Sequence, residues 1–272
     1  MPEHQETLRL DTPTSARLAS LMLGGKDHLA ADRALLTLLM AEDPHCVPVA
    51  GQSRAFLHLA ARSLAEQGQE QFLDLGCGLT TEATGTLLAP IHTSVLGARP
   101  TARTVYVDND PMVMAHARAL PHPPAPAMIR HVRADLTAPK DLLAAVRADG
   151  DLDWRRPVTV ILGDVLHELT DPQTRLLLGS LSRVLPIGSV LVLSHRTADG
   201  TDPRLTARVA AHYARSGLPW YPRGRQTVNS LLDGWGRRAP EIAAPHTRPS
   251  ADAADTPGVY TVVAVAGDRL AG

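Results

Sequence analysis

Compact apolar runs alternate with segments of helical periodicity along most of the chain after residue 70. The apolar runs predict strands at residues 71–75, 104–108, 128–134, 157–162, 189–193 and 259–265. Helical spacing predicts helices between them, at residues 111–120, 140–147, 172–185, 203–215 and 227–232. Strands that alternate with helices are typical of βαβ units. We therefore expect an α/β fold, a Rossmann-like, doubly wound and mostly parallel sheet with helices on both faces.

The first part of the chain has a different pattern. Residues 14–40 show helical spacing that is interrupted by Leu23-Gly24-Gly25-Lys26-Asp27, and residues 52–67 form an amphipathic helix with Gly68 suited to its C-cap. We expect an N-terminal helical cap over residues 1–68, followed by the α/β domain over residues 69–272. Segments rich in proline and polar residues predict loops at 121–126, 218–225 and 239–257.

Composition narrows the classes of partner. The chain has 272 residues, 44% of them hydrophobic but only 3% aromatic, and a net charge of −1. This predicts an aliphatic core and offers no basic field for nucleic acid, and we interpret the local arginine clusters at 204–225 and 237–238 as solvated surface. Two cysteines, a polar start and no long apolar run favour a cytoplasmic protein without a membrane partner. A homodimer is compatible with this picture.

Parallel sheets bind ligands beyond the carboxyl ends of their strands, so the residues that follow each strand are the candidates for chemistry. The first strand leads into Asp74-Leu75-Gly76-Cys77-Gly78, a tight turn with room for a ligand at a helix N-terminus, although Thr81 replaces the third glycine of a dinucleotide motif. Asp108 ends the second strand and can accept hydrogen bonds from ribose hydroxyls. The alternative is a helix N-cap, for which Asp110 is better placed.

The later strand ends carry more polar residues. Asp135 can accept from an adenine amine while Leu136 packs on the ring, unless Asp135 is only a cap. The fourth strand ends in Gly163-Asp164-Val165-Leu166-His167-Glu168, and the fifth ends near His195. Two histidines at adjacent strand ends predict that at least one is functional. The alternatives are a turn-capping Asp164 with a packed His167, and a metal site, for which the spacing does not match the helical zinc motif.

These motifs together resemble the class I S-adenosylmethionine (SAM)-dependent methyltransferases. Leu23-Gly24-Gly25-Lys26-Asp27, with Ala31-Asp32-Arg33, is similar more narrowly to a bacterial methyltransferase family first catalogued as a domain of unknown function. Tyr106-Val107-Asp108-Asn109-Asp110-Pro111 and Leu191-Val192-Leu193-Ser194-His195 also resemble that family. The resemblance runs from about residue 10 to the last strand.

The resemblance implies SAM as the cofactor and a set of residues around it. Gly76 and Gly78 would approach the methionine part, Asp108 would hold ribose, and Asp135 with Leu136 would hold adenine. The remaining expected cofactor residues, on the same motifs and on a covering N-terminal segment, are Gly24, Gly25, Lys26, Asp74, Asn109 and Gly163. The chain departs from the family pattern at Thr80, at the tyrosine-free helix with Leu18, Leu21 and Met22, and at Glu168.

Methyl transfer from a sulfonium needs alignment, exclusion of water and, for a protonated nucleophile, a base. We expect transfer to an O or N atom of a small metabolite, with His167 as the preferred base, His195 second, and Asp164 or Glu168 orienting a histidine or binding a substrate amine. Two alternatives stay open: intramolecular cyclisation of SAM with release of methylthioadenosine, and a non-enzymatic SAM-binding regulator. Aromatic residues that would lie near the acceptor, or else in the core, are Tyr213, Trp220, Tyr221 and Trp235.

Overall fold

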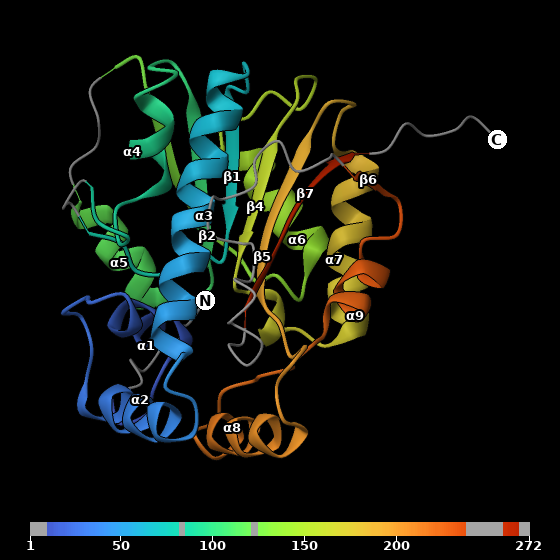
Figure 1. Cartoon of the computed structure of the whole chain (residues 1–272). Helices are drawn as coiled ribbons and strands as arrows, with labels where there is room; N and C mark the ends of the chain where they lie inside the picture. The colour runs from blue at the N-terminus through green and yellow to red at the C-terminus, as the bar shows by residue number, and fades with distance from the viewer. Residues whose placement is uncertain (1–9, 82–84, 121–124, 238–257, 267–272) are drawn as a thin grey trace, which may run out of the picture.

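The computed structural model describes residues 10–81, 85–120, 125–237 and 258–266. In this part of the chain seven strands form one sheet in the order β3-β2-β1-β4-β5-β7-β6 (Figure 1). Pairing is parallel from β3 to β5, whereas β7 runs antiparallel to both of its neighbours. The strands are β1 (Gln71–Leu75), β2 (Arg103–Asp108), β3 (Met128–Arg133), β4 (Thr159–Gly163), β5 (Val190–Arg196), β6 (Trp235–Arg237) and β7 (Val259–Ala266). The doubly wound, mostly parallel sheet is thus confirmed.

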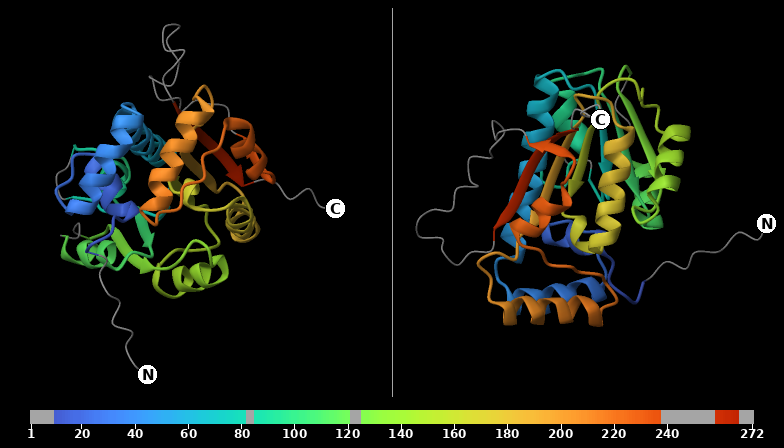
Figure 2. Two further views of the ribbon diagram at one scale, coloured as in Figure 1. Left: turned by 90° about the horizontal axis from the view of Figure 1, so that it is seen from below. Right: turned by 90° about the vertical axis from the view of Figure 1, so that its right-hand side faces the viewer.

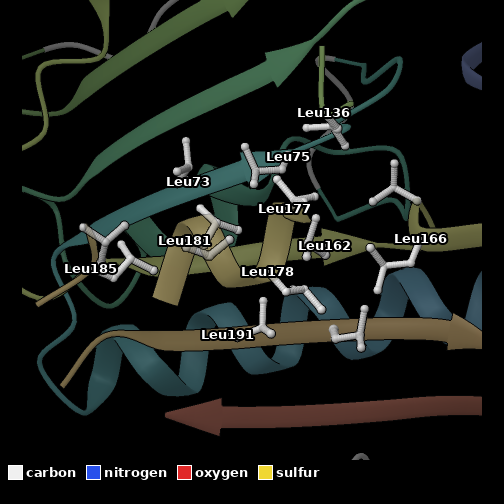
Figure 3. Close-up of a cluster of buried hydrophobic side chains, with 14 of the residues drawn as sticks. Leu73, Leu75, Leu136, Leu162, Leu166, Leu177, Leu178, Leu181, Leu185 and Leu191 are labelled. Atoms are coloured by element: carbon white, nitrogen blue, oxygen red, sulfur yellow. The ribbon is translucent and has the colours of Figure 1, made fainter. Parts of the chain in front are cut away.

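Helices cover both faces of this sheet. Alternate residues of each central strand point to opposite faces, so Phe72 packs with α3, α4 and α5 whereas Leu73 and Leu75 pack with α6, α7 and α9. Figure 3 shows leucines on the face of the sheet that α6, α7 and α9 cover. The helices are α3 (Cys46–Glu66), α4 (Ile91–Leu96), α5 (Pro111–Ala119), α6 (Pro139–Asp149), α7 (Asp171–Val184) and α9 (Arg225–Leu231). No helix in the described ranges is long and apolar enough to cross a membrane.

Three further helices form a layer beyond the carboxyl ends of the parallel strands (Figures 1 and 2). They are α1 (Ser15–Met22), α2 (Ala30–Glu42) and α8 (Pro203–Arg215), and their apolar faces join in one buried cluster that contains Leu18, Leu39 and Val209. The expected N-terminal cap therefore shares its core with a helix from the second half of the chain. The long helix α3 instead packs along the sheet.

Local chemistry explains several boundaries. The Asp110 side chain accepts from Met112 N and caps α5, as its position before Pro111 predicts. Thr170 and Gln173 form a capping box at the start of α7. Gly68 follows α3 with φ +99°, the left-handed conformation that glycine adopts without penalty.

Some elements differ from the expectation. Helix α3 begins at Cys46, before the predicted start at residue 52, and the short elements α4 and β6 were not predicted. Trp235 is buried in the core, whereas Tyr221 is exposed. Arg223 is only 4% exposed, so the interpretation of the 204–225 arginines as solvated surface is wrong for this residue. Residues 121–124 of the predicted loop at 121–126 lie outside the described residues, and so does the whole of the predicted loop at 239–257.

Candidate functional site

A cavity of about 720 Å³ lies between the carboxyl ends of the parallel strands and the helical layer. Its walls come from α1, α3, the turns after β1 to β4, and the segment after α8. Most of the expected site residues line it: Asp74, Gly76, Gly78, Asp108, Asn109, Asp135, Leu136, Gly163, Asp164, His167 and Glu168. Gly24, Gly25, Lys26 and His195 do not. We call the part near Asp108 and Asp135 the nucleoside end, and the part near α1, Glu168 and Trp220 the acceptor end.

The glycine turn after β1 shapes the nucleoside end. Gly76 and Gly78 have φ +73° and φ +64°, which glycine adopts readily. A Cβ on Gly76 would lie 2.6 Å from Val165 Cγ2, so packing excludes a side chain there. A Cβ on Gly78 would meet nothing within 4 Å, which leaves open space beside its backbone. The second glycine is therefore the one that leaves room for a ligand.

Asp108 is fixed by backbone donors. Gly78 N donates to Oδ2 at 2.9 Å, and Asp110 N donates to Oδ1 at 2.9 Å. Burial raises the pKa of Asp108, although these two hydrogen bonds oppose the rise. Each carboxylate oxygen keeps a further lone pair that can accept from a ligand hydroxyl.

The turn after β3 closes the nucleoside end. Asp135 Oδ1 accepts from Thr137 N and from Thr137 Oγ1, both at 2.8 Å, which makes an Asx turn and not a helix cap. Asp135 itself is exposed, and the neighbouring Leu136 is buried against the core. A polar acceptor and an apolar surface thus adjoin, as an adenine ring requires.

Two carboxyl groups between the ends carry buried oxygens without partners. Asp74 is 2% exposed, and its Oδ2 has no hydrogen-bond partner. Asp164 Oδ1 is likewise buried without a hydrogen-bond partner. Asp164 has φ +49°, an uncommon conformation for a non-glycine residue, and its backbone N donates to Ser194 O. Burial raises the pKa of each carboxyl to about 6, and the charge of Arg54 opposes the rise in both. Unpartnered buried oxygens beside a cavity fit the donors of a polar ligand.

Gly163 lets a helix approach the site. A Cβ there would lie 2.4 Å from Leu57 Cδ1 of α3, so this glycine is required by packing against the helix. The neighbouring Ser53 of α3 donates to Ser194 Oγ at 2.7 Å and also hydrogen-bonds Asp164. Helix α3 is thereby joined to the ends of β4 and β5.

A 3-10 turn over Leu166–Glu168 carries the polar side chains of the acceptor end. Arg223 holds this turn: it donates to Leu166 O at 2.6 Å, to Leu169 O, and to Asp171 Oδ1 at 2.7 Å. Tyr221 N adds a hydrogen bond of 2.7 Å to His167 O. The sequence analysis did not single out Arg223, because it grouped this residue with the arginines at 204–225 that were interpreted as solvated surface. Only its place beside the paired aromatic residues 220–221 offered a signal.

The two histidines lie near each other but differ in access. Their ring centroids are 6.2 Å apart; His167 lines the cavity, whereas His195 is 0% exposed. Burial, with a smaller effect of nearby positive charge or of the other ring, lowers the pKa of His167 to about 4 and of His195 to about 3. Both rings are therefore neutral at pH 7.

Burial and, less strongly, the charge of Asp108 raise the pKa of Glu168 to about 7, although a hydrogen bond with the Ser15 side chain opposes this. Among the described carboxyl groups of the cavity with a raised pKa, Glu168 thus lies nearest to pH 7, above Asp74 and Asp164 at about 6. No group of three or more His, Cys, Asp or Glu side chains could hold a metal ion in the ranges described.

Helix α1 forms one wall of the cavity, and an ion pair between Arg17 and Asp32 anchors it to α2. Arg17, 2% exposed, donates to Asp32 Oδ2 at 2.7 Å, and the same oxygen accepts from Leu29 N at 2.7 Å. After α1, Gly24 has φ +85°, and a Cβ on Gly25 would lie 2.1 Å from Ser20 Oγ. In this structure the Gly-Gly segment turns the chain behind α1, so its predicted contact with the cofactor stays a prediction.

The far wall of the acceptor end is aromatic. Tyr213 and Trp220 stack with centroids 5.3 Å apart and an interplanar angle of 7°. Arg196 lies over the Trp220 ring and forms an ion pair with buried Asp43, which ties this wall to the corner between α2 and α3. Leu18, Val49 and Leu218 also line the cavity. This wall therefore offers aromatic and aliphatic surface to a ligand.

Known proteins resemble this chain over nearly its whole length. The sequence profile of the S-adenosyl methyltransferase family matches residues 1–268. A DUF574 family protein from Streptomyces avermitilis has a similar structure, with a TM-score of 0.82 and 27% identity over 95% of this chain and 99% of that one. A Thermobifida fusca protein to which methyltransferase activity is ascribed has a TM-score of 0.81 and 28% identity over 95% and 96% of the two chains. No curated protein matches.

Proposed function

This chain belongs to the S-adenosyl methyltransferase family, and from that premise we propose that it transfers the methyl group of SAM to an oxygen or nitrogen atom of a small metabolite. The observation that carries the proposal is the single cavity of about 720 Å³, which is lined by Asp108 and Asp135 at one end and by the Tyr213–Trp220 wall at the other. The volume lies within the range of small-molecule sites, about 300–1,000 Å³.

The residues of the nucleoside end fit the cofactor. Asp108 would accept from the ribose hydroxyls, and Asp135 with Leu136 would hold the adenine. The free oxygen of Asp74 and the open space beside Gly78 suit the amino-acid part. Asn109 and Gly163 line the same region. When bound, SAM supplies an electrophilic methyl group on a sulfonium.

The chain's own part is alignment, dehydration and proton removal. Helix α1 and the Tyr213–Trp220 wall would enclose the acceptor and exclude water. An oxygen or nitrogen nucleophile that carries a proton needs a base, and general bases work best when their pKa lies near the working pH. Glu168, with its pKa raised to about 7, meets this condition better than His167, with its pKa lowered to about 4.

We therefore favour Glu168 as the proton acceptor over the histidines preferred on sequence grounds. His167 would line the acceptor as a neutral ring, and buried His195 would support His167 from behind. Asp164 would orient the acceptor or bind an acceptor amine. A cyclisation of SAM stays the alternative outcome of the test below.

The first experiment incubates the protein with SAM alone and then with a panel of small phenols, amines and carboxylic acids, and follows the products by mass spectrometry. We expect a methylated product and demethylated cofactor only when an acceptor is present. Methylthioadenosine without an acceptor would replace methyl transfer by cyclisation.

With an active acceptor, the dependence of kcat/KM for SAM on pH identifies the base, because this parameter reports on the groups of the free protein. Proton acceptance by Glu168 requires its carboxylate, so kcat/KM for SAM should rise as the pH passes through about 7. Proton acceptance by His167 would instead give a rate that is level from pH 5 to 8, because its pKa is about 4. Glu168→Gln should remove the rise and most of the turnover, whereas Glu66→Gln, on the exposed surface of α3, should change neither.

A further inference from the structure

Glu168 has an unusual environment for a carboxyl group. It lines the cavity and hydrogen-bonds the side chain of Ser15, and within the described part of the chain it forms no ion pair with a basic side chain. A charged carboxylate that is partly removed from water is costly unless a cation compensates it. The missing counter-charge therefore points to a cationic ligand.

The position of Glu168 fits the cationic part of the cofactor. Glu168 lines the same cavity as Asp108 at one end and Tyr213 at the other, and the negative charge of Asp108 helps to raise the pKa of Glu168. In SAM the sulfonium joins the ribose to the amino-acid part and carries the methyl group toward the acceptor. Asp108 would hold that ribose. The sulfonium is thus the positive charge that the cofactor brings to this region.

The other groups around Glu168 do not supply this charge. Arg196 and Arg17 line the cavity but are paired with Asp43 and Asp32. The charge of Arg54 lowers the pKa of Asp74 and of Asp164, whereas the pKa of Glu168 responds to burial, Ser15 and Asp108. On the elements around Glu168, the charged or titratable groups that line the cavity are Arg17 on α1, Cys46 and Arg54 on α3, Asp108 and Asp110 at the end of β2, Asp164 and His167 on its own loop, Arg196 on β5 and Tyr213 on α8. Asp74 and Cys77 at the end of β1 and Asp135 after β3 line it as well.

We propose that Glu168 recognises the charge of the cofactor: its carboxylate faces the sulfonium across the cavity, gives up to solvent any proton that it carries when the sulfonium binds, and so makes the cavity prefer SAM over S-adenosylhomocysteine, which lacks that charge. The inference adds to the proposed function, in which the same carboxylate accepts the acceptor's proton. Cofactor binding would thereby convert Glu168 into its basic form, and loss of the methyl group would convert it back and favour product release.

The pKa of about 7 in the free protein gives the sign of the effect. A nearby cation stabilises the carboxylate, so the pKa falls in the SAM complex and a proton is released between the two pKa values. SAM binding should then strengthen relative to S-adenosylhomocysteine binding as the pH rises. A fall of about one pKa unit would raise the affinity ratio by up to about tenfold between pH 5 and 8.

Isothermal titration calorimetry without any acceptor tests this. SAM and S-adenosylhomocysteine are each titrated at pH 7 in phosphate and in Tris, whose ionisation enthalpies differ, to obtain the number of protons released. The sulfonium also lowers the pKa of the amino group in SAM. The ionisation of each free ligand is therefore measured and subtracted, and the remaining difference reports on the effect of the sulfonium on the protein. We expect greater proton release with SAM, and an affinity ratio that increases with pH.

Glu168→Gln should abolish both differences, and Glu66→Gln should preserve them. Equal proton release by the two ligands in the natural protein, or a difference that survives in Glu168→Gln, would overturn the inference. The comparison in the natural protein is decisive even if the variant does not fold. A proton difference without methyl transfer to any acceptor would reject the proposed function alone, and methyl transfer with equal proton release would reject this inference alone.

Discussion

The two ends of the cavity are built in different ways. At the nucleoside end, Asp108 is held by the backbone N–H groups of Gly78 and Asp110, both close to strand ends. At the acceptor end, the turn with His167 and Glu168 is held by Arg223, a side chain more than fifty positions away in the sequence. The first arrangement follows from local turn geometry, and the second depends on the whole fold. Substitutions at the nucleoside end should therefore lower the affinity for the cofactor. Substitutions at the acceptor end should misalign the side chains of His167 and Glu168.

The largest effect is expected from Asp108→Asn. Each oxygen of Asp108 already accepts from a backbone donor, so the amide NH₂ of Asn must face a donor on one side. The ribose hydroxyls also lose a charged acceptor, and each such hydrogen bond contributes about 1.5–3 kcal/mol. SAM affinity measured by calorimetry should fall at least about 100-fold.

Asp202→Asn is the matched control for that change. Asp202 Oδ1 accepts from the backbone N two residues later, as in Asp108, but it caps α8 outside the cavity. Its affinity for SAM should equal that of the natural protein. An Asp108→Asn variant that binds SAM within threefold of normal would mean that the ribose is held elsewhere.

Replacement of Arg223 by Met should mainly damage the acceptor end. Leu166 O and Leu169 O lose their donor, so the turn that carries His167 and Glu168 can shift. A shift of about 1 Å can cost about 100-fold in rate. We expect kcat to fall about tenfold to 100-fold, with SAM affinity changed less than about threefold.

Two further measurements separate positioning from general loss of stability. The charge of Arg223 contributes to the lowered pKa of His167. NMR titration should therefore give a higher pKa for His167 in Arg223→Met, and in Arg223→Lys a pKa close to that in the natural protein. Arg175→Met removes an exposed arginine that also donates to a backbone carbonyl, Ser230 O, and should leave kcat unchanged. An equal loss of kcat in both Met variants would contradict a specific role for Arg223.

The difference between the ends also explains what the sequence could predict. The sheet, the glycine turn and Asp108 were predicted because each depends on residues adjacent to a strand end. The Asp110 cap was predicted for the same reason. Arg223 was misread because its burial results from contacts with the turn after β4, which no local pattern encodes. Tyr213, Trp220 and Trp235 were all candidates for the acceptor site or the core. Only the tertiary structure shows that Tyr213 and Trp220 stack at the cavity while Trp235 lies in the core.

Helix α1 offers a smaller perturbation, because it adjoins both ends. In Gly25→Ala the new Cβ would lie 2.1 Å from Ser20 Oγ and 3.1 Å from Leu88 Cδ1, so α1 or its turn must move. Such overpacking costs about 1–3 kcal/mol, which urea denaturation can measure. Gly51→Ala is the contrasting change, because that Cβ would only make ordinary contact with Leu87 at 3.5 Å and alanine favours a helix interior. Equal stability of both variants would mean that α1 is not packed as described.

The smallest effect is expected from Ser15→Ala, and it concerns only Glu168. The hydrogen bond from the Ser15 side chain lowers the pKa of Glu168 against the larger effect of burial, so its removal should raise that pKa further. One ordinary hydrogen bond corresponds to less than about one pKa unit. The rise of kcat/KM for SAM with pH should therefore move to higher pH by less than one unit, while its plateau is retained. Ser20→Ala on the same helix should leave the profile in place, and a profile that moves to lower pH in Ser15→Ala would show that the hydroxyl stabilises the protonated and not the charged form of Glu168.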